Sequence, residues 1–280
     1  MTLQSLFPVD TVPLFPPLSQ ALLTLLRELP ASDWARPTAC AGWCVKDVVA
    51  HLLGGNLGRL SYQRDQMGRV GRPTWATAAE LTALINEQNE GWVRAAQGIS
   101  APLLLDFLER TDAQMHTFFH ALPPDAPSSV GVMWAGEATS ANWFDIGREY
   151  TEKWFHQQHI REAVGAPLLA ERRWLYPVLQ ICLRALPYTY RDIEAAEGTL
   201  IAVRVTGRAS GMWSLVRENC AWMLYQGARD DAATGITMTD DTAWRLFSRG
   251  LRPEQVRRRI GIAGSVALGR PIWDLVSIMA

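Results

Sequence analysis

The sequence predicts an α+β protein of two domains, in which an up-and-down helical bundle precedes a small α+β domain. Through roughly the first 165 residues, apolar side chains recur at spacings of three and four between turn signals, which is typical of amphipathic helices. From about residue 197 the pattern changes to a two-residue alternation, which is typical of strands with one buried face. We therefore assign residues 1–168 to the bundle and residues 169–280 to the second domain.

The helices expected in the first domain follow from apolar periodicity and from helix-ending residues. Pro30 ends the first, and Pro123 with Pro124 ends the fourth, because proline cannot continue a helix. Gly165 and Pro167 close the last one. Modest loops between long helices favour antiparallel neighbours. The expected helices cover residues 17–29, 45–66, 78–98, 102–122 and 139–164.

The second domain is expected to contain a strand meander followed by helices. Two faces alternate with a two-residue period in three segments that Gly and Asn residues separate, which predicts three consecutive strands. The segments are GTLIAVRVTG, GMWSLVREN and AWMLYQG. A helix capped by Thr239 or Asp240 should follow them. A final helix is expected in PIWDLVSIMA, with Pro271 in its first turn. Residues 171–190 connect the two domains.

The composition argues against nucleic acid and membrane partners. With 27 basic and 28 acidic residues the formal net charge is -1, so no positive excess is available to bind polyphosphate or anionic lipid. No segment approaches the roughly 20 apolar residues that a bilayer span needs. The opening MTLQSLFPVDTVPLFPP also lacks the basic start and uninterrupted apolar stretch of a secretory signal. We expect a cytoplasmic protein with small-molecule partners, and the sequence leaves open whether it is a monomer or a homodimer.

Histidines and a glutamate at helical spacing are the first candidates for a metal site. Glu152 and His156 lie four apart on one expected helix, so both project from one face, about 6 Å apart along the axis. His159 continues that stripe one turn later. His51, among apolar residues of an earlier helix, is the natural third ligand. Two ligands from one helix and a third from a neighbour leave an open coordination position, as catalytic metal sites do.

Other interpretations of these residues stay open. His51 also suits a hydrogen-bonded histidine at the core edge, and an E-x-x-x-H pair is often an exposed pair worth about 0.3 kcal/mol. His116 and His120 have metal-ligand spacing too, but they lie along a polar flank. Cys40 and Cys44 could share a metal, although no second cysteine pair stands at a zinc-ribbon spacing, so free thiols are the default.

Two stretches of the chain resemble the mycothiol-dependent maleylpyruvate isomerase and DinB-like families. The first, WARPTACAGWCVKDVVAHLLG, contains a Gly-Trp turn followed by a helix that carries His51. The second, EKWFHQQHIREAVG, has the families' pattern E-x-x-x-H with a following R-x-A-x-G. The resemblance implies a DinB-like four-helix bundle in which His51, Glu152 and His156 bind a divalent metal, zinc first and nickel second. It also implies that the open position receives the sulfur of a low-molecular-weight thiol, mycothiol or bacillithiol.

The resemblance further implies an isomerase or S-transferase that acts on a small electrophilic substrate. A free thiol has a pKa of about 8.5, and coordination to a dication deprotonates it. The thiolate could add to an activated double bond and leave again, or remain attached. The chain has His159 where the families often have an acid, which makes His159 a candidate catalytic proton carrier. The isomerases also imply a substrate-binding arginine from the second domain, which this sequence does not single out.

Two other functions fit the same residues. A metal hydrolase would use the same ligands without a thiol and would turn over amides or esters in thiol-free buffer. A non-enzymatic protein would carry no metal and would bind a small apolar ligand in its second domain.

Overall fold

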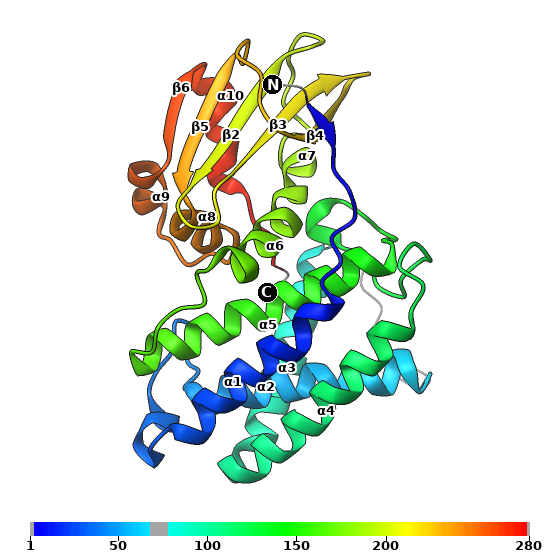
Figure 1. Cartoon of the computed structure of the whole chain (residues 1–280), viewed down its shortest axis with the longest axis vertical. Coiled ribbons are helices and arrows are strands. Elements are labelled where there is room, and N and C mark those ends of the chain that lie inside the picture. The colour runs from blue at the N-terminus through cyan, green and yellow to red at the C-terminus, as the bar shows by residue number, and fades with distance from the viewer. Residues whose placement is uncertain (1–2, 68–77, 279–280) are drawn as a thin grey trace. The chain divides into compact units, whose positions relative to one another are not determined.

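The computed structural model describes residues 3–67 and 78–278, which form two compact units (Figure 1). The helical unit comprises Asp10–Ser129 and Glu152–Leu168. The sheet unit comprises Val130–Thr151, Leu169–Ile278 and the N-terminal segment up to Val9. The α+β class predicted from the sequence is confirmed, whereas the assignment of independent domains to residues 1–168 and 169–280 stays a prediction.

The helices of the helical unit pack with their apolar faces in one core. Helix α2 packs against α3 and α4, and α1 packs against α4. In the described part of the chain, no helix combines the length and apolar character that a membrane span requires. The helices are α1 (Phe15–Glu28), α2 (Val45–Arg59), α3 (Ala78–Ala95), α4 (Ala101–Ala121) and, from Glu152 onward, α5 (Asn142–Val164). The core includes Leu22, Leu23 and Leu26 of α1, Val45, Val48, Val49, Leu52 and Leu53 of α2, and Leu104 and Leu108 of α4.

A tight turn precedes α2 and fixes where that helix begins. The Val45 N–H donates to the Arg36 carbonyl at 3.0 Å, which closes the loop. Gly42 at the turn has φ +77°, a conformation that favours glycine because a Cβ would be strained there. Cys44 is a weak cap by type, but its N–H donates to Asp47 Oδ2 at 3.0 Å. The residues between Arg36 and Val45 are thereby held at the start of α2.

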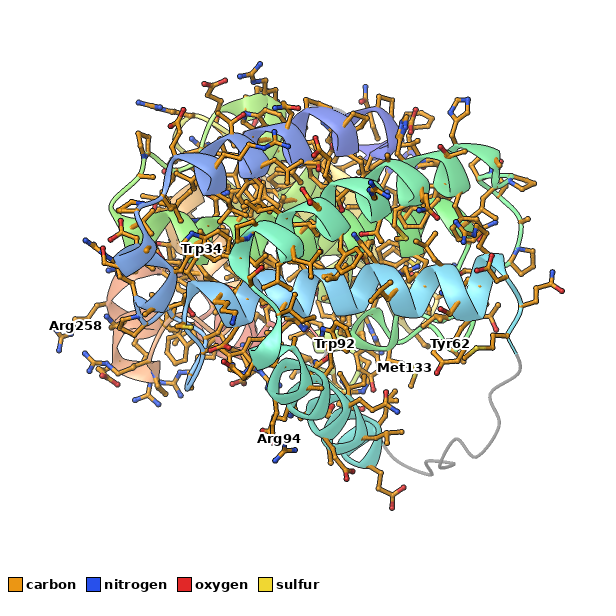
Figure 2. All side chains as sticks on the ribbon, turned by 90° about the horizontal axis from the view of Figure 1, so that it is seen from below. Trp34, Tyr62, Trp92, Arg94, Met133 and Arg258 are labelled. Atoms are coloured by element: carbon orange, nitrogen blue, oxygen red, sulfur yellow. The ribbon has the colours of Figure 1, made fainter. Side chains whose placement is uncertain are left out.

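Gly54 on α2 allows a tryptophan of α3 to pack closely. Trp92, labelled in Figure 2, donates its indole N–H to the Ala50 carbonyl at 2.7 Å. A Cβ built on Gly54 would lie 2.5 Å from Trp92 Cδ1, whereas one on Gly55 would meet no atom within 4 Å. The contact with Trp92 therefore requires glycine at position 54 and not at position 55.

We expect Gly54→Ala to lower the free energy of unfolding by about 1–3 kcal/mol, since the added methyl displaces the indole. The matched variant Gly55→Ala should raise the free energy of unfolding by up to about 1 kcal/mol, because alanine is the better helix former. Urea denaturation followed by circular dichroism measures both changes. Equal effects of the two substitutions would contradict the close packing at Gly54.

The sheet of the described residues has six strands in the order β1-β4-β3-β2-β5-β6. The antiparallel meander of β2, β3 and β4 confirms the three predicted strands. Strand β5 runs parallel to β2, and β6 and β1 pair antiparallel at the two edges. The strands are β1 (Gln4–Ser5), β2 (Leu200–Thr206), β3 (Gly211–Glu218), β4 (Ala221–Gln226), β5 (Thr234–Thr239) and β6 (Gly261–Gly264).

The helices of this unit confirm one predicted helix and correct another. Helix α8 is capped as expected, since Thr239 Oγ1 accepts the N–H of Thr242 at 3.1 Å. The predicted final helix is wrong up to residue 278, where the description ends, because a 3-10 turn, Arg270–Asp274, forms there and residues 275–278 are not helical. The Ser277 N–H donates to the Phe247 carbonyl at 3.0 Å, and this distant partner replaces a helical one. The helices are α6 (Arg172–Cys182), α7 (Leu186–Thr189), α8 (Asp240–Phe247), α9 (Pro253–Arg259) and α10 (Val266–Gly269).

Candidate metal centre

The three ligands predicted from the sequence come together in the helical unit. His51 extends from α2, and Glu152 and His156 extend from α5. Glu152 Oε1 lies 3.1 Å from His51 Nε2 and 3.0 Å from His156 Nε2. The side chains of both histidines are 13% exposed and that of Glu152 is 34% exposed, so a small ion or ligand can reach them. One carboxylate oxygen is thus placed between two imidazole nitrogens.

These donors fit a divalent metal ion. Their ligand atoms all lie within 4.8 Å of one another. Bonds of 2.0–2.1 Å in a tetrahedral zinc site place neighbouring ligand atoms roughly 3.3 Å apart, close to the distances found at Glu152. Two histidines and one glutamate are also a donor set of catalytic zinc sites, which keep a fourth position open. The ligand role of the three residues stays a proposal.

The charges of these side chains depend on one another. Burial alone would raise the pKa of Glu152, but the charges and hydrogen bonds of His156 and His51 hold it well below its usual range. Burial lowers the pKa of His156, but the Glu152 carboxylate and the Cys40 sulfur outweigh burial and raise that pKa to about 10. Protons and a dication would compete for the same nitrogen and oxygen atoms.

The second sequence motif holds α5 in place. Arg161 donates to the Pro167 carbonyl at 2.9 Å and to the Ala21 carbonyl of α1 at 3.1 Å. Gly165, with φ +72°, ends the helix as the sequence predicts. The arginine and glycine of the motif therefore position the segment that carries Glu152 and His156.

Cys40 lies beside this centre, a position that the sequence does not predict. Its sulfur lies 3.2 Å from His159 Nδ1 and 3.7 Å from His156 Nδ1. Burial would raise the pKa of the Cys40 thiol, but the two histidines outweigh burial and lower it to about 5. The sulfur of Cys44 instead donates to Asp47 Oδ2 at 3.0 Å. The two cysteines considered as a metal-binding pair thus have different partners, although both lie in the turn before α2.

The rival histidine pair lies elsewhere on the unit. His116 is partly buried and His120 is exposed on α4, with ring centroids 6.2 Å apart. In the described residues, the groups of three close metal donors include neither of them. The geometry therefore favours His51, Glu152 and His156 over His116 and His120 as metal ligands.

Comparisons with known proteins agree with the fold and with the resemblance that the sequence indicates. The family model described as the mycothiol maleylpyruvate isomerase N-terminal domain matches residues 15–161. Two uncharacterised proteins of Mycobacterium tuberculosis, from strains CDC 1551 / Oshkosh and H37Rv, are each 26% identical over 215 residues, covering 76% of this chain and 79% of the relative.

Solved structures extend the similarity to both units. A crystal structure of mycothiol-dependent maleylpyruvate isomerase has a TM-score of 0.55 at 11% identity, with 93% of this chain and 95% of that chain covered. A histidine-to-alanine mutant of a mycothiol-dependent maleylpyruvate isomerase gives 0.54 at 12% identity, with the same coverage. At these identities the likeness shows a shared fold.

Proposed function

Because this chain belongs to the mycothiol maleylpyruvate isomerase N-terminal domain family, we propose that it is a metal-dependent enzyme that uses a low-molecular-weight thiol. The supporting observation is the group His51, Glu152 and His156, whose donor atoms lie within 4.8 Å of one another. The proposed metal is zinc, with nickel as the second choice, and the proposed thiol is mycothiol or bacillithiol. In this proposal the helical unit is a DinB-like four-helix bundle.

The three ligands suit thiol activation. A divalent ion held by them would supply positive charge that keeps a thiol deprotonated at neutral pH. Glu152 is the single negative ligand, so a dication would keep a net positive charge toward the open side. The Trp43 ring, whose centroid lies 5.0 Å from that of His51, forms an apolar wall beside this histidine. The Cys40 sulfur, 3.7 Å from His156 Nδ1, would accept a hydrogen bond from Nδ1–H and so leave the Nε2 lone pair free for the metal.

The proposed substrate is a small electrophile with an activated double bond. Addition of the thiolate to one carbon makes the bond between the two carbons single, which allows rotation about it. Elimination of the same thiolate restores the double bond in the other geometry and regenerates the thiol, which gives isomerisation. Retention of the thiol gives S-transfer. His159 remains the proposed proton carrier, and its Nδ1 faces the sulfur of Cys40 at 3.2 Å.

The test is elemental analysis of the full-length protein and of its His156→Ala variant. We expect about one zinc or nickel ion per wild-type chain and none in the variant, with helix content unchanged by circular dichroism. His120→Ala is the matched control, since this exposed histidine lies outside the centre and should leave the metal content unchanged. Stoichiometric metal in His156→Ala, or a wild type that takes up no metal on incubation, would overturn the proposal.

Measuring substrate turnover with and without an added thiol tests whether the enzyme requires one. Wild-type protein is expected to isomerise maleylpyruvate, or to form a thioether with it, only when mycothiol or bacillithiol is added. Hydrolysis of esters or amides in thiol-free buffer by the metal-loaded protein would instead assign the centre to a hydrolase.

A further inference from the structure

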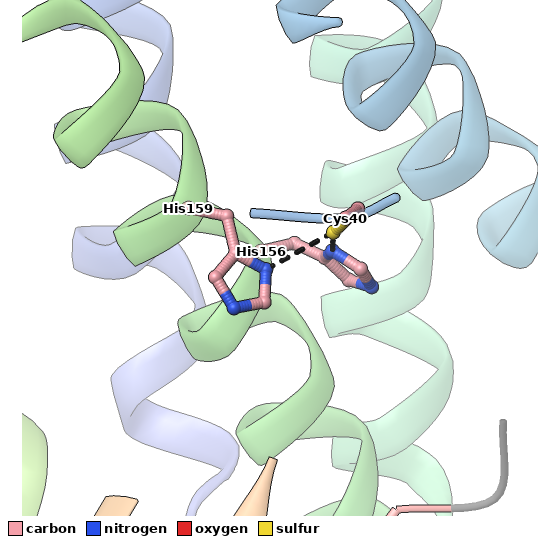
Figure 3. Close-up of side chains that lie close together, drawn as sticks. All are labelled: Cys40, His156 and His159. Carbon is pink, nitrogen blue, oxygen red and sulfur yellow. Dashed lines mark hydrogen bonds between the residues drawn. The ribbon is translucent and has the colours of Figure 1, made fainter. Parts of the chain in front are cut away.

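Cys40, His156 and His159 form a second cluster of metal-ligating side chains. Figure 3 shows the sulfur of Cys40 between the two imidazole rings of α5. Its distances are 3.2 Å to His159 Nδ1 and 3.7 Å to His156 Nδ1, and all three donor atoms lie within 4.8 Å of one another. The cluster combines a loop residue with two residues that are three apart on one helix.

The spacing of these atoms is that of ligands around one ion. Zinc bonds of about 2.3 Å to sulfur and 2.0–2.1 Å to nitrogen, at the tetrahedral angle, place the two atoms roughly 3.5 Å apart. The distances from the Cys40 sulfur to the two Nδ1 atoms lie on either side of that value. Thiolate and imidazole together select thiophilic and borderline cations such as Zn²⁺, Co²⁺ and Cd²⁺.

The turn before α2 fixes the cysteine in this position. The Cys40 N–H donates to Thr38 Oγ1 at 3.2 Å, and Thr38 Oγ1 donates to the Trp43 carbonyl at 2.9 Å. The Trp43 N–H in turn donates to the Cys40 carbonyl at 3.0 Å. A loop held by its own hydrogen bonds keeps the sulfur facing α5 without help from a metal.

His156 belongs to both clusters but offers a different nitrogen to each. Its Nε2 faces Glu152 at 3.0 Å, and its Nδ1 faces Cys40. A neutral imidazole has one nitrogen with a free lone pair and one that carries a proton. Coordination at Nδ1 therefore leaves the proton on Nε2, where it is donated to Glu152, so one neutral ring serves one of the two positions at a time.

We propose that Cys40, His156 and His159 are a second binding site for a thiophilic cation, which competes with the first centre for His156. On binding, Cys40 coordinates as the thiolate and each histidine coordinates through Nδ1 as the neutral ring, and any proton that these side chains lose to the cation goes to solvent. The site needs neither His51 nor Glu152, so cation binding there does not require the first centre, whereas its competition for His156 rests on the proposed function. A cation that prefers sulfur would draw His156 away from the first centre.

The test is a Co²⁺ titration of the metal-stripped, full-length His51→Ala variant, in which a ligand of the first centre is missing. We expect a thiolate-to-cobalt charge-transfer band in the near ultraviolet that saturates at one equivalent. The band should be absent when Cys40→Ser is added and should persist when the matched substitution Cys44→Ser is added instead. Adding His159→Ala should weaken cobalt binding by about 10-fold or more, since loss of a ligand costs at least as much as loss of an outer partner.

A second measurement needs no substitution. Cd²⁺ is expected to slow alkylation of Cys40 in the wild type by about 10-fold or more, because a coordinated thiolate is protected, and to leave the exposed Cys220 unchanged. No charge-transfer band in His51→Ala together with no protection of Cys40, or a band that survives Cys40→Ser, would overturn the second site. If the first centre bound no metal, wild-type protein would bind Co²⁺ only at the second site. All of its bound Co²⁺ would then give the thiolate-to-cobalt charge-transfer band.

Discussion

Replacing Lys153 by methionine is expected to lower the free energy of unfolding by about 3–5 kcal/mol, the cost of leaving a buried charge without its partner. Lys153 Nζ donates to Asp112 Oδ1 at 2.9 Å and to Asn56 Oδ1 at 2.8 Å. The two charged side chains are only 10% and 9% exposed. Methionine keeps most of the side-chain volume. The expected loss of stability therefore comes from the buried Asp112 carboxylate, which loses its positively charged partner.

The loss should be large because Asp112 joins several helices of the helical unit. Asn56 of α2 donates to Asp112 Oδ1 at 2.8 Å, and Ser19 of α1 donates to Asp112 Oδ2 at 2.5 Å. The remaining donors satisfy hydrogen bonds but do not neutralise the charge. Adding Asp112→Asn to Lys153→Met removes that charge, so the double variant should be more stable than the sum of the two single losses predicts.

Lys46, the only other lysine of the chain, provides the control. Its Nζ donates to the Gln97 carbonyl at 2.8 Å in an exposed position, so Lys46→Met should cost no more than about 1 kcal/mol. Urea denaturation monitored by circular dichroism compares the wild type with Lys153→Met, Asp112→Asn, their double variant and Lys46→Met. A loss at Lys153 no larger than that at Lys46 would show that the buried pair does not hold the helices together.

The parts that could be predicted from sequence depend on contacts within one element. Glu152 and His156 share a helix face because they lie four apart, and the Gly165 stop follows from its conformational freedom. The three-strand meander follows from alternation and short turns. The apolar context of His51 on its helix and the family resemblance both predict it beside them, and its Nε2 lies 3.1 Å from Glu152 Oε1.

The parts that could not be predicted depend on packing between distant segments. Asn56, Asp112 and Lys153 each look like an ordinary polar residue on its own helix, and only the packed helices bring them together. The sequence indicates free thiols for Cys40 and Cys44 by default, with a shared metal as the alternative, whereas the Cys40 sulfur contacts His159 of α5. The predicted final helix fails for the same reason, since Ser277 finds a backbone partner at Phe247.

Zinc at about 1,000 times its Kd is expected to raise the free energy of unfolding by about 4 kcal/mol, because a ligand that binds only the folded state stabilises it by mass action. The Cys40→Ser background isolates the first centre, since it removes the sulfur of the proposed second site. Adding Glu152→Gln should abolish most of the gain, because an amide replaces the only anionic ligand.

Glu162→Gln on the same background is the matched control for Glu152→Gln. Glu162 lies on the same helix and is exposed, so its substitution should leave the zinc-dependent gain unchanged. Urea denaturation with zinc and with EDTA gives the gain for each protein. Binding of zinc to the cysteines and histidines of the unfolded chain reduces all the gains alike, so the comparison between Glu152 and Glu162 keeps its meaning. If both substitutions left the same gain, zinc would be stabilising the fold from a position other than the three proposed ligands.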